Sequence, residues 1–168
     1  MIRFKGRTFL YKIYSWLPII ILYFSVLNEF DLNYLNIEYF SFNFPLILIF
    51  YFSLKDYSKF DYMLVFFAGI INDTVIGLPL GLSSLSYIMV CIFASYLRNM
   101  TIRPHLIKDW FYFLFVISFI NSMSYSILFL FFYYELDIMF YVINTLFTFL
   151  FYVPFSYFLN YYLKGIDD

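Results

Sequence analysis

Long apolar runs separated by charged residues make up most of this chain. The uncharged runs cover 13–28, 39–54, 110–134 and 138–163, and a longer run at 62–97 is interrupted only by Asp73. The longer run exceeds the roughly 20 residues of one helical bilayer crossing, and Gly77-Leu78-Pro79-Leu80-Gly81 near its middle favours a turn. We therefore predict six transmembrane helices at about 13–28, 39–54, 62–76, 82–97, 110–134 and 138–163.

The composition strengthens the membrane prediction. Of 168 residues, 64% are hydrophobic and only 12% are charged, against about 25% charged residues in a soluble domain. The 28% of aromatic residues is more than a core of this size could enclose, so lipid must cover the remainder. A net charge of -1 argues against nucleic acid as a partner and, with the apolar content, against disorder. The predicted fold class is an all-α integral membrane protein with a single domain over 1–168.

The positive charges predict an orientation. The opposite loops carry acidic residues and no cation, and cations near span ends are retained in the cytoplasm, so we expect both termini to be cytoplasmic. The basic start resembles a secretory signal, but no small-x-small cleavage site follows, which favours an uncleaved first span. A re-entrant hairpin at 62–97 remains an alternative, because loop charge does not distinguish it from two crossings. All ten cations fall on the predicted cytoplasmic side: Arg3, Lys5, Arg7, Lys12, Lys55, Lys59, Arg98, Arg103, Lys108 and Lys164.

Asp73 is the candidate functional residue, because it is the one ionisable residue inside a predicted span. A carboxylate near the bilayer centre costs roughly 2.5–3.5 kcal/mol. Two interpretations are open: an interface-level acid that caps the turn, or a buried contact to a partner or ligand. Gly69, Asp73 and Gly77 share one helical face and predict a close packing seam, and Pro79 between Gly77 and Gly81 predicts a tight turn.

Other polar residues predict packing rather than chemistry. The lone His105 lies in a predicted loop without metal-ligand spacing, and Cys91 lies alone in an apolar span, so we predict no catalytic residue, no metal and no cofactor. A membrane enzyme is the least supported class. Polar stripes on the last three spans should face protein: Ser83, Tyr87, Cys91 and Ser95; Ser118, Asn121, Ser122, Tyr125 and Ser126; Asn144, Thr148, Tyr152 and Ser156.

The segment 67–85, FAGIINDTVIGLPLGLSSL, resembles the core of the bacterial rod shape-determining protein MreD family. The shared pattern is Gly-x-x-x-Asp-x-x-x-Gly-x-x-x-Gly, here Gly69, Asp73, Gly77 and Gly81. The resemblance extends to Pro45 at the start of the second span, Arg98 at the end of the fourth and Pro154 late in the sixth.

The resemblance implies a non-catalytic scaffold in the bacterial inner membrane, in the cell-elongation machinery. It implies binding to the bitopic protein MreC, in one assembly with MreB, a RodA-type synthase and a penicillin-binding transpeptidase of peptidoglycan synthesis. It also implies a fold similar to the substrate-binding subunits of energy-coupling-factor transporters. The residues carried over as partner-binding or structural core are Gly69, Asp73, Gly77, Pro79 and Gly81.

The alternative function is that of such a transporter subunit, which binds a vitamin in an extracytoplasmic pocket. Those subunits typically carry an Ala-x-x-x-Ala seam in the first span. The alanines of this chain are Ala68 and Ala94, and 14–27 contains none. This difference favours the scaffold.

Overall fold

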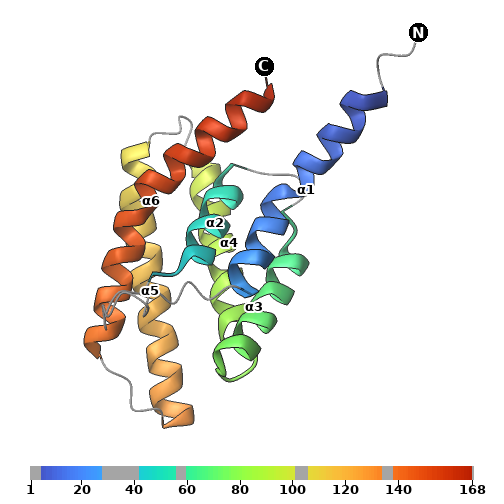
Figure 1. The fold of residues 1–168 in the computed structure, drawn as a ribbon. Helices are drawn as coiled ribbons and strands as arrows, with labels where there is room; N and C mark the ends of the chain where they lie inside the picture. Colours follow the sequence, from blue (N-terminus) through green and yellow to red (C-terminus); the bar gives the residue numbers. More distant parts are fainter. Residues whose placement is uncertain (1–4, 28–41, 56–59, 101–105, 134–137, 168) are drawn as a thin grey trace, which may run out of the picture.

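The computed structural model describes residues 5–27, 42–55, 60–100, 106–133 and 138–167, and every regular element in these ranges is an α-helix (Figure 1). The predicted all-α class is therefore confirmed, with one helix in each predicted span. In chain order the helices are α1 (Lys5–Leu27), α2 (Phe44–Leu54), α3 (Tyr62–Ile76), α4 (Leu82–Met100), α5 (Leu106–Phe132) and α6 (Ile138–Asp167).

The helix boundaries follow local capping chemistry. α2 begins at Phe44, later than the predicted 39, because the Asn43 side chain accepts a hydrogen bond from the Leu46 amide at 3.3 Å and Pro45 lies in the first turn. Residues 39–41 lie outside the described ranges. α1, α5 and α6 extend beyond their predicted spans into residues with charged side chains, since charge limits burial in lipid but does not end a helix.

Helix length separates two of the six helices from the rest. In the described part of the chain, only Leu106–Phe132 and Ile138–Tyr161 are long and apolar enough to cross a membrane by themselves. α2 has 11 residues and α3 has 15, which gives about 16 and 22 Å at a rise of ~1.5 Å per residue. Both are shorter than a hydrocarbon core of ~30 Å. The described residues thus form six helices, of which two have the length and composition needed to cross a membrane.

α2 occupies the middle of the bundle (Figure 1). Every residue of Pro45–Ser53 is buried, and α1, α4 and α6 all pack against this helix. α3 packs against α1 and α4, and α5 packs against α4 and α6. A helix that is apolar on all sides belongs in such an enclosed position.

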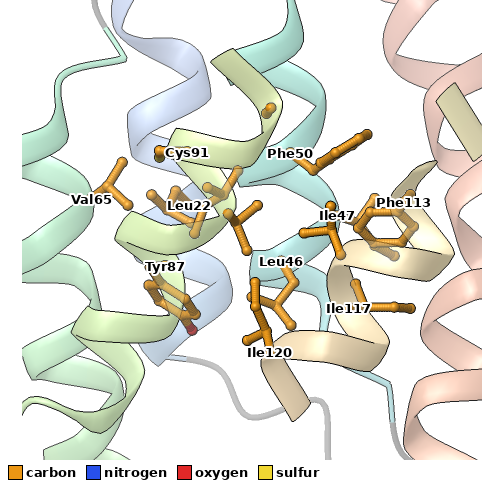
Figure 2. Packing of buried hydrophobic residues seen from close by; sticks show 14 of the residues in the cluster. Leu22, Leu46, Ile47, Phe50, Val65, Tyr87, Cys91, Phe113, Ile117 and Ile120 are labelled. Atoms are coloured by element: carbon orange, nitrogen blue, oxygen red, sulfur yellow. The ribbon is translucent and has the colours of Figure 1, made fainter. Parts of the chain in front are cut away.

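The core lies on both sides of α2: Figure 2 shows Leu22, Val65 and Tyr87 on one side, and Phe113 and Ile117 of α5 on the other. Phe113 of α5 lies 5.0 Å from Phe50 of α2 and 4.5 Å from Tyr152 of α6, measured between ring centroids. The outside is also apolar: Phe115 is 68% exposed and Phe158 is 64% exposed. A surface of this kind matches a lipid environment better than water.

Polar contacts join the ends of three helices. The Lys55 amine, just after α2, donates to Oδ1 of Asn160 on α6 at 3.0 Å. Arg98 on α4 donates to the carbonyl oxygen of Ser53 on α2 at 3.2 Å. The two cations therefore lie at the same end of the bundle, where α6 also ends (Figure 1).

Candidate functional site

Asp73 caps the helix that follows it. It lies in the last turn of α3 with 0% of its surface exposed. One carboxylate oxygen accepts a hydrogen bond from the Gly81 amide at 2.7 Å and the other from the Ser83 amide at 2.9 Å. The first amides of a helix have no partner within the helix, and negative charge is favourable at that end. The Asp73 side chain thus supplies the cap of α4 from the neighbouring helix.

The turn between α3 and α4 depends on two left-handed glycines. Gly77 has φ of 76° and Gly81 has φ of 100°. The Gly77 and Leu78 amides both donate to the Asp73 carbonyl oxygen, which ends α3. A Cβ added at either glycine would meet nothing within 4 Å. Backbone conformation, rather than lack of space, therefore favours glycine at both positions.

Gly69 lets the backbones of α3 and α4 approach closely. A Cβ at this position would lie 2.4 Å from Cα and 2.5 Å from the amide nitrogen of Ser84. The Ser84 hydroxyl donates to the carbonyl oxygen of Phe66 at 3.0 Å, and the Asn72 side-chain amide (Nδ2) donates to the Ser83 hydroxyl at 2.9 Å. We call the antiparallel pair from Tyr62 to Met100 the α3–α4 hairpin.

The five predicted site residues belong to this one hairpin. Gly69 and Asp73 lie in its interface, and Gly77, Pro79 and Gly81 form its turn. Of the two interpretations of Asp73, the geometry matches the capping acid, since both carboxylate oxygens bind backbone amides. Whether these residues also contribute to partner binding stays a prediction.

Ser83 and Ser84 are important contacts of this site that sequence reasoning did not single out. Ser83 was expected only as part of a polar stripe, and Ser84 was not expected to contribute at all. The available signal was their position directly after Gly81, because serines are favoured near the start of a helix. Their partners on α3 could not be identified from spacing, since these contacts depend on how closely the two backbones approach.

The predicted polar stripes face protein on α4 and α6 but only in part on α5. Thr148, Tyr152 and Ser156 of α6 are buried, as are Ser83, Tyr87 and Cys91 of α4. On α5, Asn121 donates to the Thr145 hydroxyl at 2.7 Å. The prediction was wrong for the exposed residues Ser118, Ser122 and Ser126. Among the described residues, α5 packs mainly against α6 and α4, with Phe113 also reaching Phe50 of α2, and the side that carries these serines is exposed.

Tyr87 is a buried residue whose hydroxyl has no hydrogen-bond partner within the described ranges. It lies on α4 one turn after Ser83, in the core (Figure 2). The sequence predicts no catalytic role for Cys91 or His105. Cys91 is buried beside the Ser53 hydroxyl, which donates to its sulfur at 3.4 Å, and His105 lies outside the described residues. Among those that are described, no group of three or more His, Cys, Asp or Glu side chains could hold a metal ion.

No family model, curated protein or solved structure matches the chain. Function is therefore inferred from the residues and geometry of this chain.

Proposed function

We propose that this chain is a non-catalytic scaffold of the bacterial cell-elongation machinery, which helps to determine rod shape by organising peptidoglycan synthesis through MreC. One observation carries the proposal. Gly69, Asp73, Gly77 and Gly81, the residues that carry the resemblance to the MreD family, all serve to hold the α3–α4 hairpin in one shape. A carboxylate fixed by two backbone amides suits a structural role better than proton transfer, which needs a free position at the reacting group.

The proposed location is the bacterial inner membrane, with six crossings and with the start of α1 and the end of α6 on the cytoplasmic side. The distribution of cations in the sequence supports this orientation. Two features support six crossings despite the short α2 and α3. α2 is enclosed by protein along Pro45–Ser53, so it needs no lipid contact, and a bilayer thins locally around short spans.

A fixed hairpin offers a partner a surface that does not need to be ordered on binding. Apolar side chains surround its turn: Val75 and Ile76 at the end of α3, and Leu80, which is 71% exposed. We propose this surface as the contact region for MreC, which would bring MreB, the RodA-type synthase and the penicillin-binding transpeptidase into one assembly. Asp73 is enclosed, so its contribution to partner binding is indirect, through the shape of the turn.

The alternative is a substrate-binding subunit of an energy-coupling-factor vitamin transporter. The Tyr87 hydroxyl favours it, because a buried hydroxyl without a partner is costly and a polar ligand group would satisfy it. This alternative predicts a stoichiometric small molecule bound to the purified chain. Tyr87→Phe would then release that molecule while leaving the fold intact.

Affinity purification separates the two functions. The tagged chain is purified from its native membrane in mild detergent, and both proteins and small molecules are identified by mass spectrometry. The scaffold predicts recovery of MreC and elongation proteins, with recovery reduced for Leu80→Ser and unchanged for Tyr161→Ser, a matched change of an exposed residue near the end of α6. Recovery of a vitamin-like ligand or an ATPase module instead of MreC would replace the scaffold with the transporter subunit.

A further inference from the structure

Neither α3 nor α4 resembles an independent membrane-spanning helix. α3 has 15 residues and ends on Asn72 and Asp73 in its last turns. α4 has 19 residues but contains several serines and Arg98. By length and hydropathy, α5 and α6 qualify as spans, whereas α3 and α4 do not. A carboxylate that enters hydrocarbon without partners is strongly disfavoured.

α4 and the turn before it satisfy the polar side chains of α3. In the described residues, the side-chain hydrogen bonds that leave α3 run to α4 or to Gly81 just before it. Asp73 binds the Gly81 and Ser83 amides, Asn72 binds the Ser83 hydroxyl, and the Tyr62 and Ser95 hydroxyls lie 3.0 Å apart at the other end of the pair. α1 reaches α3 through a backbone atom, since the Tyr23 hydroxyl donates to the Leu64 carbonyl oxygen at 3.0 Å.

Once paired, the α3–α4 hairpin is apolar where it faces outward. Met63, Phe67 and Val75 are exposed on α3, and Leu85 and Ile92 are exposed on α4. The polar side chains that leave α3 are therefore satisfied within the pair, while α4 also reaches its neighbours, since the Ser86 and Ser124 hydroxyls lie 3.0 Å apart and Arg98 donates to Ser53. Exposed apolar side chains cover much of the outer side, as they do on a single spanning helix.

We propose that α3 and α4 enter the membrane as a preformed hairpin, whereas α5 and α6 enter as independent helices. The inference rests on the membrane topology proposed above. It assigns the close approach at Gly69 a role in membrane insertion as well as in the final packing. Disrupting that approach is expected to prevent the 77–81 turn from crossing, even when the substitution makes α3 more hydrophobic.

The test uses the full chain with Leu80→Cys as a reporter, expressed without MreC so that position 80 stays uncovered, and pulse-labelled from outside with a membrane-impermeant maleimide. The parent chain, with only the buried Cys91, sets the background. Gly69→Leu separates the helices and raises the hydropathy of α3. Thr74→Leu is the matched control, since Thr74 is exposed and its hydroxyl bonds only within α3, to Ile71. A second reporter, Tyr133→Cys at the exposed end of α5, follows the rest of the chain.

We expect Gly69→Leu to lower labelling at position 80 by about threefold or more, with Thr74→Leu unchanged and position 133 labelled in all variants. Equal labelling of Gly69→Leu and Thr74→Leu would overturn the proposal, because hydropathy alone would then govern insertion. Loss of labelling at both reporters would also overturn it, because the defect would not be confined to the hairpin. If position 80 is never labelled in the otherwise unchanged chain, the proposed topology is wrong and the hairpin proposal with it. Recovery of MreC tests the proposed function separately.

Discussion

The α3–α4 and α5–α6 pairs are both antiparallel, but they are held together differently. The α3–α4 interface has backbones in contact at Gly69 and a buried carboxylate that binds amides of the facing helix. The α5–α6 interface consists mainly of large rings, including Trp110 and Phe149, which stack with centroids 4.5 Å apart. Close approach and buried charge leave little freedom of substitution, whereas ring packing between long helices is more tolerant.

The difference indicates which contacts each pair needs if the chain lies in a membrane as proposed. α5 and α6 are long and apolar enough to remain in a bilayer by themselves, so their mutual contacts adjust the packing. α3 and α4 are not long and apolar enough for this, so we expect their contacts with each other to decide whether the two helices are stable in a bilayer. Substitutions in the two pairs should therefore have unequal effects.

The largest effect is expected for Gly69→Ala. Its Cβ would lie 2.4 Å from the Ser84 Cα, so the two backbones must separate and the Asp73 hydrogen bonds must lengthen. We expect a loss of about 3 kcal/mol of stability, at the upper end for an overpacked site. Thermal unfolding of the purified chain in detergent measures it. Ser122→Leu, which adds more volume at an exposed site on α5, should change the unfolding midpoint little. Similar shifts of the midpoint for the two variants would show that the α3–α4 pair is no more sensitive to added volume than α5.

Asp73→Leu is expected to follow. It removes two charge-assisted hydrogen bonds, each worth about 1.5–3 kcal/mol, but also removes the cost of burying a carboxylate, so the net loss should be about 2 kcal/mol. The variant should still insert, because Gly69 still allows the backbones of α3 and α4 to approach closely, and should recover less MreC from membranes. Asp73→Asn keeps one acceptor and should give a smaller loss. Unchanged recovery of MreC with Asp73→Leu would remove Asp73 from the account of assembly.

Gly77→Ala should destabilise the hairpin by about 1 kcal/mol, because a left-handed backbone is unfavourable for a residue with a Cβ. Space is not the reason, since nothing lies within 4 Å of the added atom. Gly77→Asn is the informative control: asparagine tolerates this conformation, so its unfolding midpoint should lie between those of alanine and glycine. Equal midpoints for alanine and asparagine would show that conformation is not the determinant.

The smallest effect is expected for Asn121→Ala on α5. It removes the hydrogen bond to Thr145 at 2.7 Å, and hydrogen bonds between membrane helices contribute about 0.6 kcal/mol on average. A double-mutant cycle with Thr145→Val isolates the pair. A coupling energy as large as the effect of Gly69→Ala would mean that the α5–α6 pair depends on its specific contacts as strongly as the α3–α4 hairpin does.

The sequence was most informative where structure depends on local signals. α3 was predicted at 62–76 and lies at Tyr62–Ile76, because Asp61 caps its start and left-handed Gly77 ends it. The turn containing Pro79 followed from the same kind of signal. The capping role of Asp73 was one of two interpretations, because sequence spacing does not show whether a carboxylate meets an amide or a partner.

The rest depends on packing between distant segments. The close approach of Gly69 to Ser84 depends on the distance between the axes of α3 and α4. The spacing of residues along the sequence does not predict that distance. The enclosed position of α2 depends on the helices that surround it. Its late start depends on Asn43, whose backbone amide also donates to the Thr148 hydroxyl at 2.9 Å. The prediction that the serines of α5 face protein was wrong because helical spacing shows that they share one side of the helix. It does not show whether another helix covers that side.

The proposed function depends on the claim that Asp73 holds the start of α4. Residue-resolved amide hydrogen exchange of the chain in lipid nanodiscs tests it directly, by comparing the Gly81 and Ser83 amides with and without Asp73→Leu. We expect slow exchange of both amides in the unchanged chain and exchange faster by about tenfold or more in the variant, since local opening then exposes them. Equal exchange in the two chains would show that Asp73 does not hold the turn.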